Sequence, residues 1–203
     1  MSTSQTVLLI AGSPSAQSRS AALLDAVAQQ LAQHNNLTID RLNIRELPAS
    51  ALLLADWTHP SVVAAIAQVA RAQAVVVATP VYKAAYSGML KVFLDLLPEA
   101  ALKGKTVLPL ATGGSPHHML ALDYALRPVL QALSARHILP GVYATDSQIP
   151  KAHNKGDNKV YSVGPETAGR LDDAVANRML EGFRVSATSG FEPVHFSLVR
   201  CSV

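Results

Sequence analysis

The chain has 203 residues, of which 49% are hydrophobic and 15% charged, and its net charge is +3. The length predicts one domain with a full core; the lack of a Lys/Arg run argues against a nucleic-acid protein, and the single Cys201 excludes a disulfide framework or a cysteine metal site. No run reaches the about 18 apolar residues of a membrane span and no signal peptide is visible, so we expect a cytoplasmic protein whose apolar surface is partly buried against other subunits.

Two strand-and-helix units are expected in the first part of the chain. The apolar run 6–11 predicts a strand buried on both faces, and an amphipathic helix follows over about 20–33. The alternating segment 37–42 predicts an edge strand, and Pro60 opens a second helix that ends near residue 71. The connection over 43–60 shows no clear period.

A third unit predicts both the centre of the sheet and a contact surface. Residues 74–79 predict the central strand, and residues 88–97 predict a helix that is apolar nearly all round except at Lys91 and Asp95. Such a helix is either central or lies at a subunit interface. Because helices lie outside a doubly wound sheet, we expect it at an oligomer interface.

Two further strands are predicted over 105–111 and 137–144, with a long helix over 117–134 between them. Pro128 falls inside that helix, where a proline removes a donor and clashes with the carbonyl four residues earlier, that of Tyr124. A kink or a π-bulge around Tyr124 is therefore expected.

The remaining segments complete a single domain. Residues 146–165 are polar and rich in turn formers, which predicts a mobile connection, and a last helix is expected over 165–183. Five strands alternating with helices predict a flavodoxin-like, doubly wound α/β fold with a five-stranded parallel sheet in the order 2-1-3-4-5. The expected domain covers residues 1–184, and residues 185–203 form a C-terminal tail.

The loop after the first strand, GSPSAQSRS, is rich in hydroxyl groups. It leads into a helix N-terminus, where free backbone N–H groups and the helix dipole favour an anion. Ser13, Ser18 and Ser20 add hydroxyl donors and Arg19 adds a charge, so the loop suits a phosphate monoester; the alternative is an ordinary serine-capped helix. The loop lacks the G-x-G-x-x-G pattern of a dinucleotide site, and the GKT triplet at 104–106 precedes a strand, which rules out a P-loop.

Two more loops follow strands at the same edge of the predicted sheet. In TPVYKAAYSG, Pro80 stiffens the backbone and Tyr82 offers an aromatic ring; the alternative is a turn with a core tyrosine. In ATGGSP, Gly113 and Gly114 permit close backbone approach, and their N–H groups suit the pyrimidine edge of a flavin; the alternative is a simple glycine turn. Because ligands of open α/β sheets bind at the carboxyl ends of strands, the three loops together predict an FMN site.

Neither a metal nor a catalytic side chain is expected. His117 and His118 are neighbours on a predicted helix, so they point apart, and no third ligand is apparent. No Ser-His-Asp arrangement or nucleophile elbow is visible. Hydride transfer needs reacting atoms held about 3–3.5 Å apart, and the cofactor carries the chemistry, so we name no general acid or base.

Three stretches, GSPSAQSRS, ATPVYKAAYSGMLKVFLDLLPEAALKGKTVLPLATGG and LALDYALRPVL, resemble the NADPH-dependent FMN reductases of two-component alkanesulfonate monooxygenase systems. The resemblance covers about residues 6–147. It implies that NADPH reduces FMN by hydride transfer to N5, and that the reduced FMN passes to a partner FMN-dependent monooxygenase, which releases sulfite from a sulfonate. It also implies a homo-oligomer, dimer or tetramer, with Tyr124 on a π-helix at the interface near the flavin.

The same resemblance assigns FMN contacts to the three loops. The implied contacts are Ser13, Ser18, Arg19 and Ser20 for the phosphate, Pro80, Val81, Tyr82 and Lys83 for the ring system, and Thr112, Gly113, Gly114 and Ser115 for the far edge of the ring. Many relatives have an arginine where this chain has Ser15, so Arg19 is expected to supply the charge.

Two other functions fit the same pattern. The fold also supports enzymes that hold FMN tightly and reduce quinones, azo dyes or metal oxyanions, and fold alone does not separate them. A flavodoxin-type one-electron carrier is the second alternative, although such carriers tend to be acidic and this chain is basic. No recognisable motif for the 2′-phosphate separates NADPH from NADH.

Overall fold

The computed structural model describes residues 5–152 and 160–180. Seven strands in that part of the chain form one sheet with the order β2-β1-β3-β5-β6, in which β7 also pairs with β5 and β4 pairs with β3. Their bounds are β1 (Gln5–Ala11), β2 (Leu37–Asn43), β3 (Ala74–Tyr82), β4 (Ala85–Tyr86), β5 (Thr106–Gly113), β6 (His137–Ile138) and β7 (Val142–Thr145). All pairs are parallel except β3 with β4.

The predicted fold class is confirmed, and the strand order is close to the predicted one, although the short antiparallel β4 was not predicted. β6 pairs with the start of β5 and β7 with its end, so together they act as one interrupted fifth strand. The interruption falls at Pro140 and Gly141. A Cβ at Gly141 would lie 2.8 Å from Leu122 Cδ1 and 3.1 Å from the Pro109 carbonyl, so a larger residue there would require Leu122 and the β5 backbone to shift.

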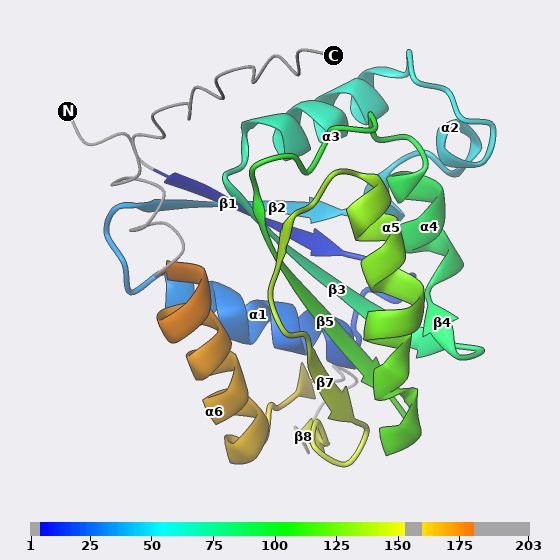
Figure 1. Ribbon diagram of the computed structural model, residues 1–203. Helices are drawn as coiled ribbons and strands as arrows, with labels where there is room; N and C mark the ends of the chain where they lie inside the picture. Colours follow the sequence, from blue (N-terminus) through cyan, green and yellow to red (C-terminus); the bar gives the residue numbers. More distant parts are fainter. Residues whose placement is uncertain (1–4, 153–159, 181–203) are drawn as a thin grey trace, which may run out of the picture.

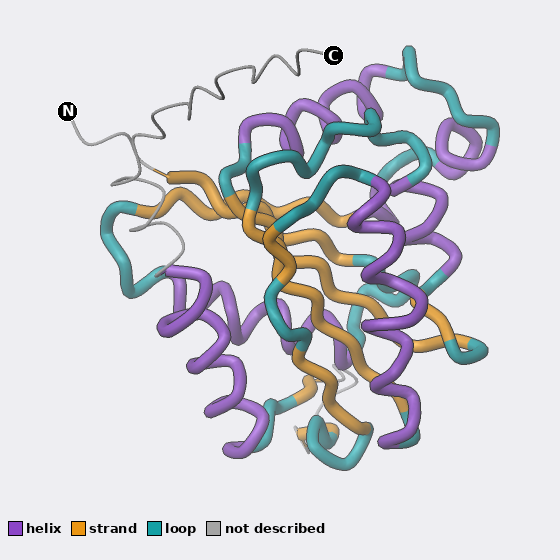
Figure 2. Tube along the Cα trace, viewed as in Figure 1, coloured by secondary structure: helices purple, strands orange, loops and turns teal. Residues whose placement is uncertain are grey.

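Helices cover both faces of the sheet (Figures 1 and 2). α1 (Arg19–Leu31) and α6 (Pro165–Asp172) pack on one face, while α3 (Pro60–Arg71), α4 (Gly88–Leu94) and α5 (Arg127–Ala132) pack on the other. The remaining elements are short: α2 (Ala49–Leu53), 3₁₀ turns at Ile44–Glu46 and Pro116–Met119, π-helices at Leu122–Leu126 and Asp173–Met179, and the hairpin of β8 (Lys151–Ala152) with β9 (Val160–Tyr161).

Burial of both faces explains the continuous apolar strands. Along β1, Leu8 and Ile10 belong to the core beneath α3 and α4, while Val7 and Leu9 belong to the core beneath α1 and α6. Fully burying a side chain of this size contributes about 1.5–3 kcal/mol. β2 lies at the edge of the sheet, as the sequence predicts, and it is less buried than β1, with Leu42 as its one buried residue.

The predicted helix over 117–134 is divided into three pieces. A 3₁₀ turn is followed by the π-helix Leu122–Leu126, and α5 begins only at Arg127. Pro128 lies just after the π-turn, and this widened turn takes up the clash of the proline ring with the preceding carbonyls. Of the two expectations around Tyr124, a kink or a π-bulge, the structure has π geometry, and the predicted helical region is present but ends at Ala132.

Two other helices differ from the sequence expectation. α4 ends at Leu94, and its apolar residues Leu90, Phe93 and Leu94 are buried in the chain's own core. The last helix changes to π geometry at Asp173, and the predicted limits at residues 183–184 and the tail 185–203 lie outside the described residues. None of the helices in the described part of the chain is long and apolar enough to cross a membrane.

Candidate functional site

Residues from all three predicted loops line one crevice of about 260 Å³. It lies at the carboxyl ends of β1, β3 and β5, beside the point where the strand order reverses between β1 and β3. The lining residues are Ser13, Ser15, Gln17, Ser18, Arg19, Pro80, Val81, Tyr82, Thr112, Gly113, Gly114, Asp146 and Tyr161. Of the sequence-predicted contacts, these do not include Ser20, Lys83 and Ser115. A larger hollow of about 600 Å³ between β2 and α3 contains none of the loop residues.

The first loop starts at a close approach of two strands and a helix. The Gly12 N–H donates to the Ala78 carbonyl at 2.8 Å, and the Ser87 hydroxyl donates to the Gly12 carbonyl. A Cβ at Gly12 would lie 3.0 Å from the Ala78 carbonyl and 3.1 Å from Leu90 Cβ. The backbone that enters the loop is therefore fixed by β3 and α4 on both sides.

Hydroxyl groups of this loop are partly engaged in holding its shape. Ser13 Oγ accepts from the Ser15 N–H at 3.2 Å, and Ser18 Oγ caps α1 by accepting from the Ala21 N–H at 3.1 Å. Ser20 is buried behind Ser18, with 3.1 Å between the two hydroxyl oxygens. When Ser20 donates to Ser18, the Ser18 proton is free to donate into the crevice.

The guanidinium of Arg19 faces the C-terminal side of the crevice. Its Nε donates to the Ile149 carbonyl at 3.0 Å, and a terminal nitrogen lies 3.2 Å from an Asp146 carboxylate oxygen. The ring centroid of Tyr161 lies 5.0 Å from Arg19 Cζ, a cation–π distance. Arg19 thus belongs to the first loop but contacts residues 146–161, which are far away in the sequence.

The second loop is a tight hairpin between β3 and β4. Lys83 and Ala84, at its tip, have φ angles of +49° and +63°, the left-handed pair that a two-residue hairpin turn requires. Behind the tip, Thr79 Oγ1 accepts from the Ser87 N–H at 2.9 Å. Tyr82 is 50% exposed and lines the crevice, so it is not the core tyrosine of the alternative interpretation.

The third loop rests on a buried tyrosine. The Tyr143 hydroxyl donates to the Ser115 carbonyl at 2.6 Å, and burial, with a smaller contribution from the Asp146 carboxylate, raises the pKa of Tyr143. Tyr143 therefore stays protonated and remains a donor at neutral pH. A Cβ at Gly113 would lie 2.6 Å from the Tyr143 hydroxyl oxygen, whereas one at Gly114 would meet nothing within 4 Å.

Four lining residues were missed by sequence reasoning as site residues: Ser15, Gln17, Asp146 and Tyr161. Ser15 and Gln17 lie inside the first loop, so the sequence pattern that identified this loop could have identified them as well. Asp146 directly follows β7, and a polar residue at a strand's carboxyl end is a usable signal. Tyr161 lies in a segment without periodicity, and only the packing of β9 against the first loop brings it to the crevice.

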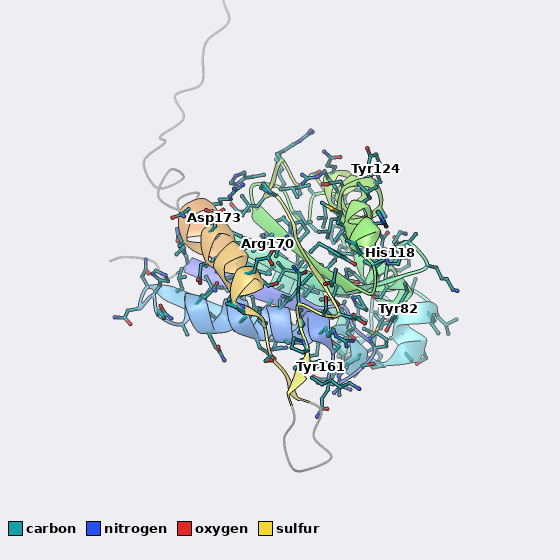
Figure 3. The ribbon with its side chains drawn as sticks, turned by 90° about the horizontal axis from the view of Figure 1, so that it is seen from below. Tyr82, His118, Tyr124, Tyr161, Arg170 and Asp173 are labelled. Atoms are coloured by element: carbon teal, nitrogen blue, oxygen red, sulfur yellow. The ribbon has the colours of Figure 1, made fainter. Side chains whose placement is uncertain are left out.

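The donor set suits a phosphorylated planar ring such as FMN. Serine hydroxyls at a helix N-terminus, the exposed ring of Tyr82 and the glycine backbone of the third loop all line the same crevice. In Figure 3, Tyr82 and Tyr161 lie at the crevice end of the molecule. No group of three or more His, Cys, Asp or Glu residues placed to hold a metal occurs within 5–152 and 160–180.

The residues predicted at an oligomer interface lie outside the crevice. Tyr124 is 80% exposed at the periphery of the molecule (Figure 3), and Met119 and Leu120 beside it are more than half exposed. The π-helix that carries Tyr124 contacts β4 of the Tyr82 hairpin. Lys91 and Asp95 form an exposed ion pair of 2.6 Å along α4, which raises the pKa of Lys91.

Comparison with known proteins gives consistent matches over most of the chain. A family model described as NADPH-dependent FMN reductase matches residues 5–149. An FMN reductase (NADPH) of Escherichia coli (strain K12) is 46% identical over 83% of this chain and 85% of its own length. An FMN reductase (NADPH) of Pseudomonas putida is 45% identical, over 93% of this chain and 91% of its own.

One solved structure repeats the architecture. The apo form of an NADH:FMN oxidoreductase (EMOB) superimposes with a TM-score of 0.75 at 35% identity, covering 93% of this chain and 92% of that one. A Pseudomonas putida protein named NADH-dependent FMN reductase SfnE is 34% identical over 73% of this chain and 81% of its own length.

Proposed function

The chain belongs to the NADPH-dependent FMN reductase family, and from that premise we propose that its three-loop crevice holds FMN during reduction and then releases the reduced flavin to an FMN-dependent monooxygenase. The enzyme is an oxidoreductase whose cofactors are FMN and NADPH. The observation that carries the proposed site is the meeting of phosphate-type donors, an exposed tyrosine and a glycine loop in one crevice.

Each loop has a separate task in this proposal. Ser13, Ser18 and the first N–H groups of α1 bind the phosphate, with Arg19 nearby and Ser20 supporting Ser18 from behind. Pro80, Val81 and Tyr82 flank the ring system, and Lys83 lies at the tip of the same hairpin.

The third loop completes the site at the opposite end. Backbone N–H groups of Thr112, Gly113, Gly114 and Ser115 are the candidate donors to the pyrimidine edge. Bound FMN supplies the hydride acceptor; fixed donors at that edge stabilise the negative charge that reduction leaves there. Tyr143 holds this loop through the Ser115 carbonyl, so it positions donors without touching the ligand.

The crevice favours a flavin that exchanges over one that is held permanently. Its about 260 Å³ is smaller than the about 300–1,000 Å³ of pockets that enclose a drug-sized ligand. Part of FMN would therefore lie outside the walls of a single chain. An exposed flavin suits transfer to a second protein, and it argues against the alternatives of a tightly bound prosthetic group or a one-electron carrier.

The proposal also includes the protein that receives the reduced FMN. We take it to be an alkanesulfonate-type monooxygenase, on the resemblance of the three loop-containing stretches to reductases of those systems. We also assign the reaction to the cytoplasm, because it consumes NADPH. Purified chain mixed with the candidate monooxygenase and a sulfonate should release sulfite only when NADPH and FMN are both present; sulfite release without this chain would contradict the pairing.

We propose that the chain forms an oligomer through the exposed surface around the π-helix Leu122–Leu126. Tyr124, Met119 and Leu120 form an apolar surface that a second subunit would cover, and the Lys91–Asp95 pair lies on α4, which packs on the same face of the sheet. Tyr124→Ala should reduce oligomer size in sizing experiments and change flavin retention, because the π-helix contacts the hairpin of Tyr82. Unchanged size and titration would remove Tyr124 from the interface.

The central test is direct. Adding FMN and NADPH to the pure protein should cause loss of the NADPH absorbance band well above the uncatalysed rate. Dialysis separates the alternatives, because protein that loses its yellow colour on dialysis uses FMN as a substrate, whereas a retained flavin that reduces quinones indicates a prosthetic group. No NADPH oxidation in the presence of FMN would contradict the proposed function.

A further inference from the structure

The charges that line the crevice cancel. Among its described lining residues, Arg19 is the one cation and Asp146 the one carboxylate, and the two form an ion pair of 3.2 Å. The FMN phosphate carries close to two negative charges at neutral pH. The remaining polar lining near α1 is neutral, provided by Ser13, Ser15 and Ser18.

Several contacts at once hold the side chain of Arg19 on residues that follow β7. Besides Asp146, its guanidinium donates to the Ile149 carbonyl at 3.0 Å and lies over the Tyr161 ring at 5.0 Å. To pair with a phosphate, Arg19 has to share or leave the carboxylate. Asp146 itself is about half exposed, and its carboxylate is the group that occupies the Arg19 guanidinium on this side of the crevice.

We propose that Asp146 is an affinity-setting residue, which lowers the affinity for the FMN 5′-phosphate by engaging Arg19. The inference rests on the proposed FMN site and deepens it. A reductase that must release its flavin gains from a phosphate site that binds through neutral donors alone. Asp146 therefore keeps FMN exchangeable without contacting the ring system.

Flavin titration of Asp146→Asn tests this proposal. The amide keeps the size of the side chain and removes its charge, so the Kd for FMN should fall about three- to tenfold. The Kd for riboflavin, which lacks the phosphate, should stay unchanged, and added salt should weaken FMN binding to the variant more than to the wild type. Asp25→Asn is the matched control, because Asp25 also pairs with an arginine, Arg41, but does not line the crevice.

A double-variant cycle isolates the role of Arg19. In the Arg19→Gln background, Asp146→Asn should no longer tighten FMN, because no guanidinium is released. A gain that persists there would overturn the inference, since Asp146 would then act on the phosphate without Arg19. Equal changes for FMN and riboflavin would also overturn it, because they would indicate a general change of the crevice wall.

Different results contradict the proposed FMN reductase function and the role of Asp146. A wild-type protein that binds neither flavin overturns the proposed function together with this inference. A wild-type protein that binds and reduces FMN, but whose Asp146→Asn variant binds FMN equally or more weakly, overturns the inference alone. Fluorescence quenching of free flavin gives both constants without an activity measurement.

Discussion

The two sides of the crevice are held by different kinds of interaction. The floor, formed by the loops after β1, β3 and β5, is fixed by backbone contacts, such as the Gly12 N–H on the Ala78 carbonyl and the close approach at Gly113. The C-terminal wall, formed by Asp146 and Tyr161, contacts the first loop through the side chain of Arg19, which also donates to the Ile149 carbonyl. We therefore expect the floor to set where a ligand lies and the wall to set how tightly it is held.

The largest expected effect comes from breaking the floor at Gly113. Gly113→Ala places a methyl 2.6 Å from the Tyr143 hydroxyl oxygen, so either the tyrosine or the loop must move and the bond to the Ser115 carbonyl is lost. We expect a loss of about 1–3 kcal/mol in the free energy of unfolding and weaker FMN binding. Gly114→Ala is the control and should unfold like the wild type, since nothing lies near its Cβ. Equal stabilities of all three proteins in denaturant unfolding would contradict the rigid floor.

The second-largest effect is expected at Ser18, in the part of the floor proposed to bind the phosphate. Ser18→Ala removes the cap of α1 and costs about 1 kcal/mol of stability. It should weaken FMN more than riboflavin, because the phosphate alone meets this hydroxyl. The two flavins are compared by fluorescence titration, and equal losses would remove Ser18 from phosphate binding.

A smaller effect is expected from the wall. Tyr161→Ala removes the ring under Arg19 and should cost about 0.5–1 kcal/mol, with Tyr161→Phe close to the wild type because the ring is kept. Thermal unfolding of the three proteins measures the difference. If the phenylalanine variant lost as much as the alanine variant, the hydroxyl rather than the stacked ring would hold the wall.

The smallest effect concerns alkaline pH. The raised pKa of Tyr143 means that the folded state binds its proton more tightly than the unfolded state does. The contribution of Tyr143 to the free energy of unfolding is therefore fully present below the ordinary tyrosine pKa of about 10. It is lost as the pH rises through the higher pKa of the folded state. Tyr143→Phe should unfold with a shallower loss of stability above that pH than the wild type. Parallel pH profiles would show that Tyr143 does not titrate differently on folding.

Much of the fold follows from local sequence pattern. The apolar runs predict strands buried on both faces, and Pro128 predicts a kink or a π-bulge around Tyr124, because both signals act within a few residues. The three loops are visible for the same reason, since each directly follows a strand. Which of their residues contact FMN stays a prediction.

The sequence by itself determined the succession of strands and helices along the chain and the position of the loops after the strands, because periodicity and turn residues encode local structure. Only the tertiary structure decided the wall. Arg19 and Ile149 are 130 residues apart in the chain, and their pairing depends on how β7 and the segment after it pack beside α1. Such contacts between distant side chains leave no periodic signal, because they are selected by three-dimensional proximity rather than by neighbours along the chain.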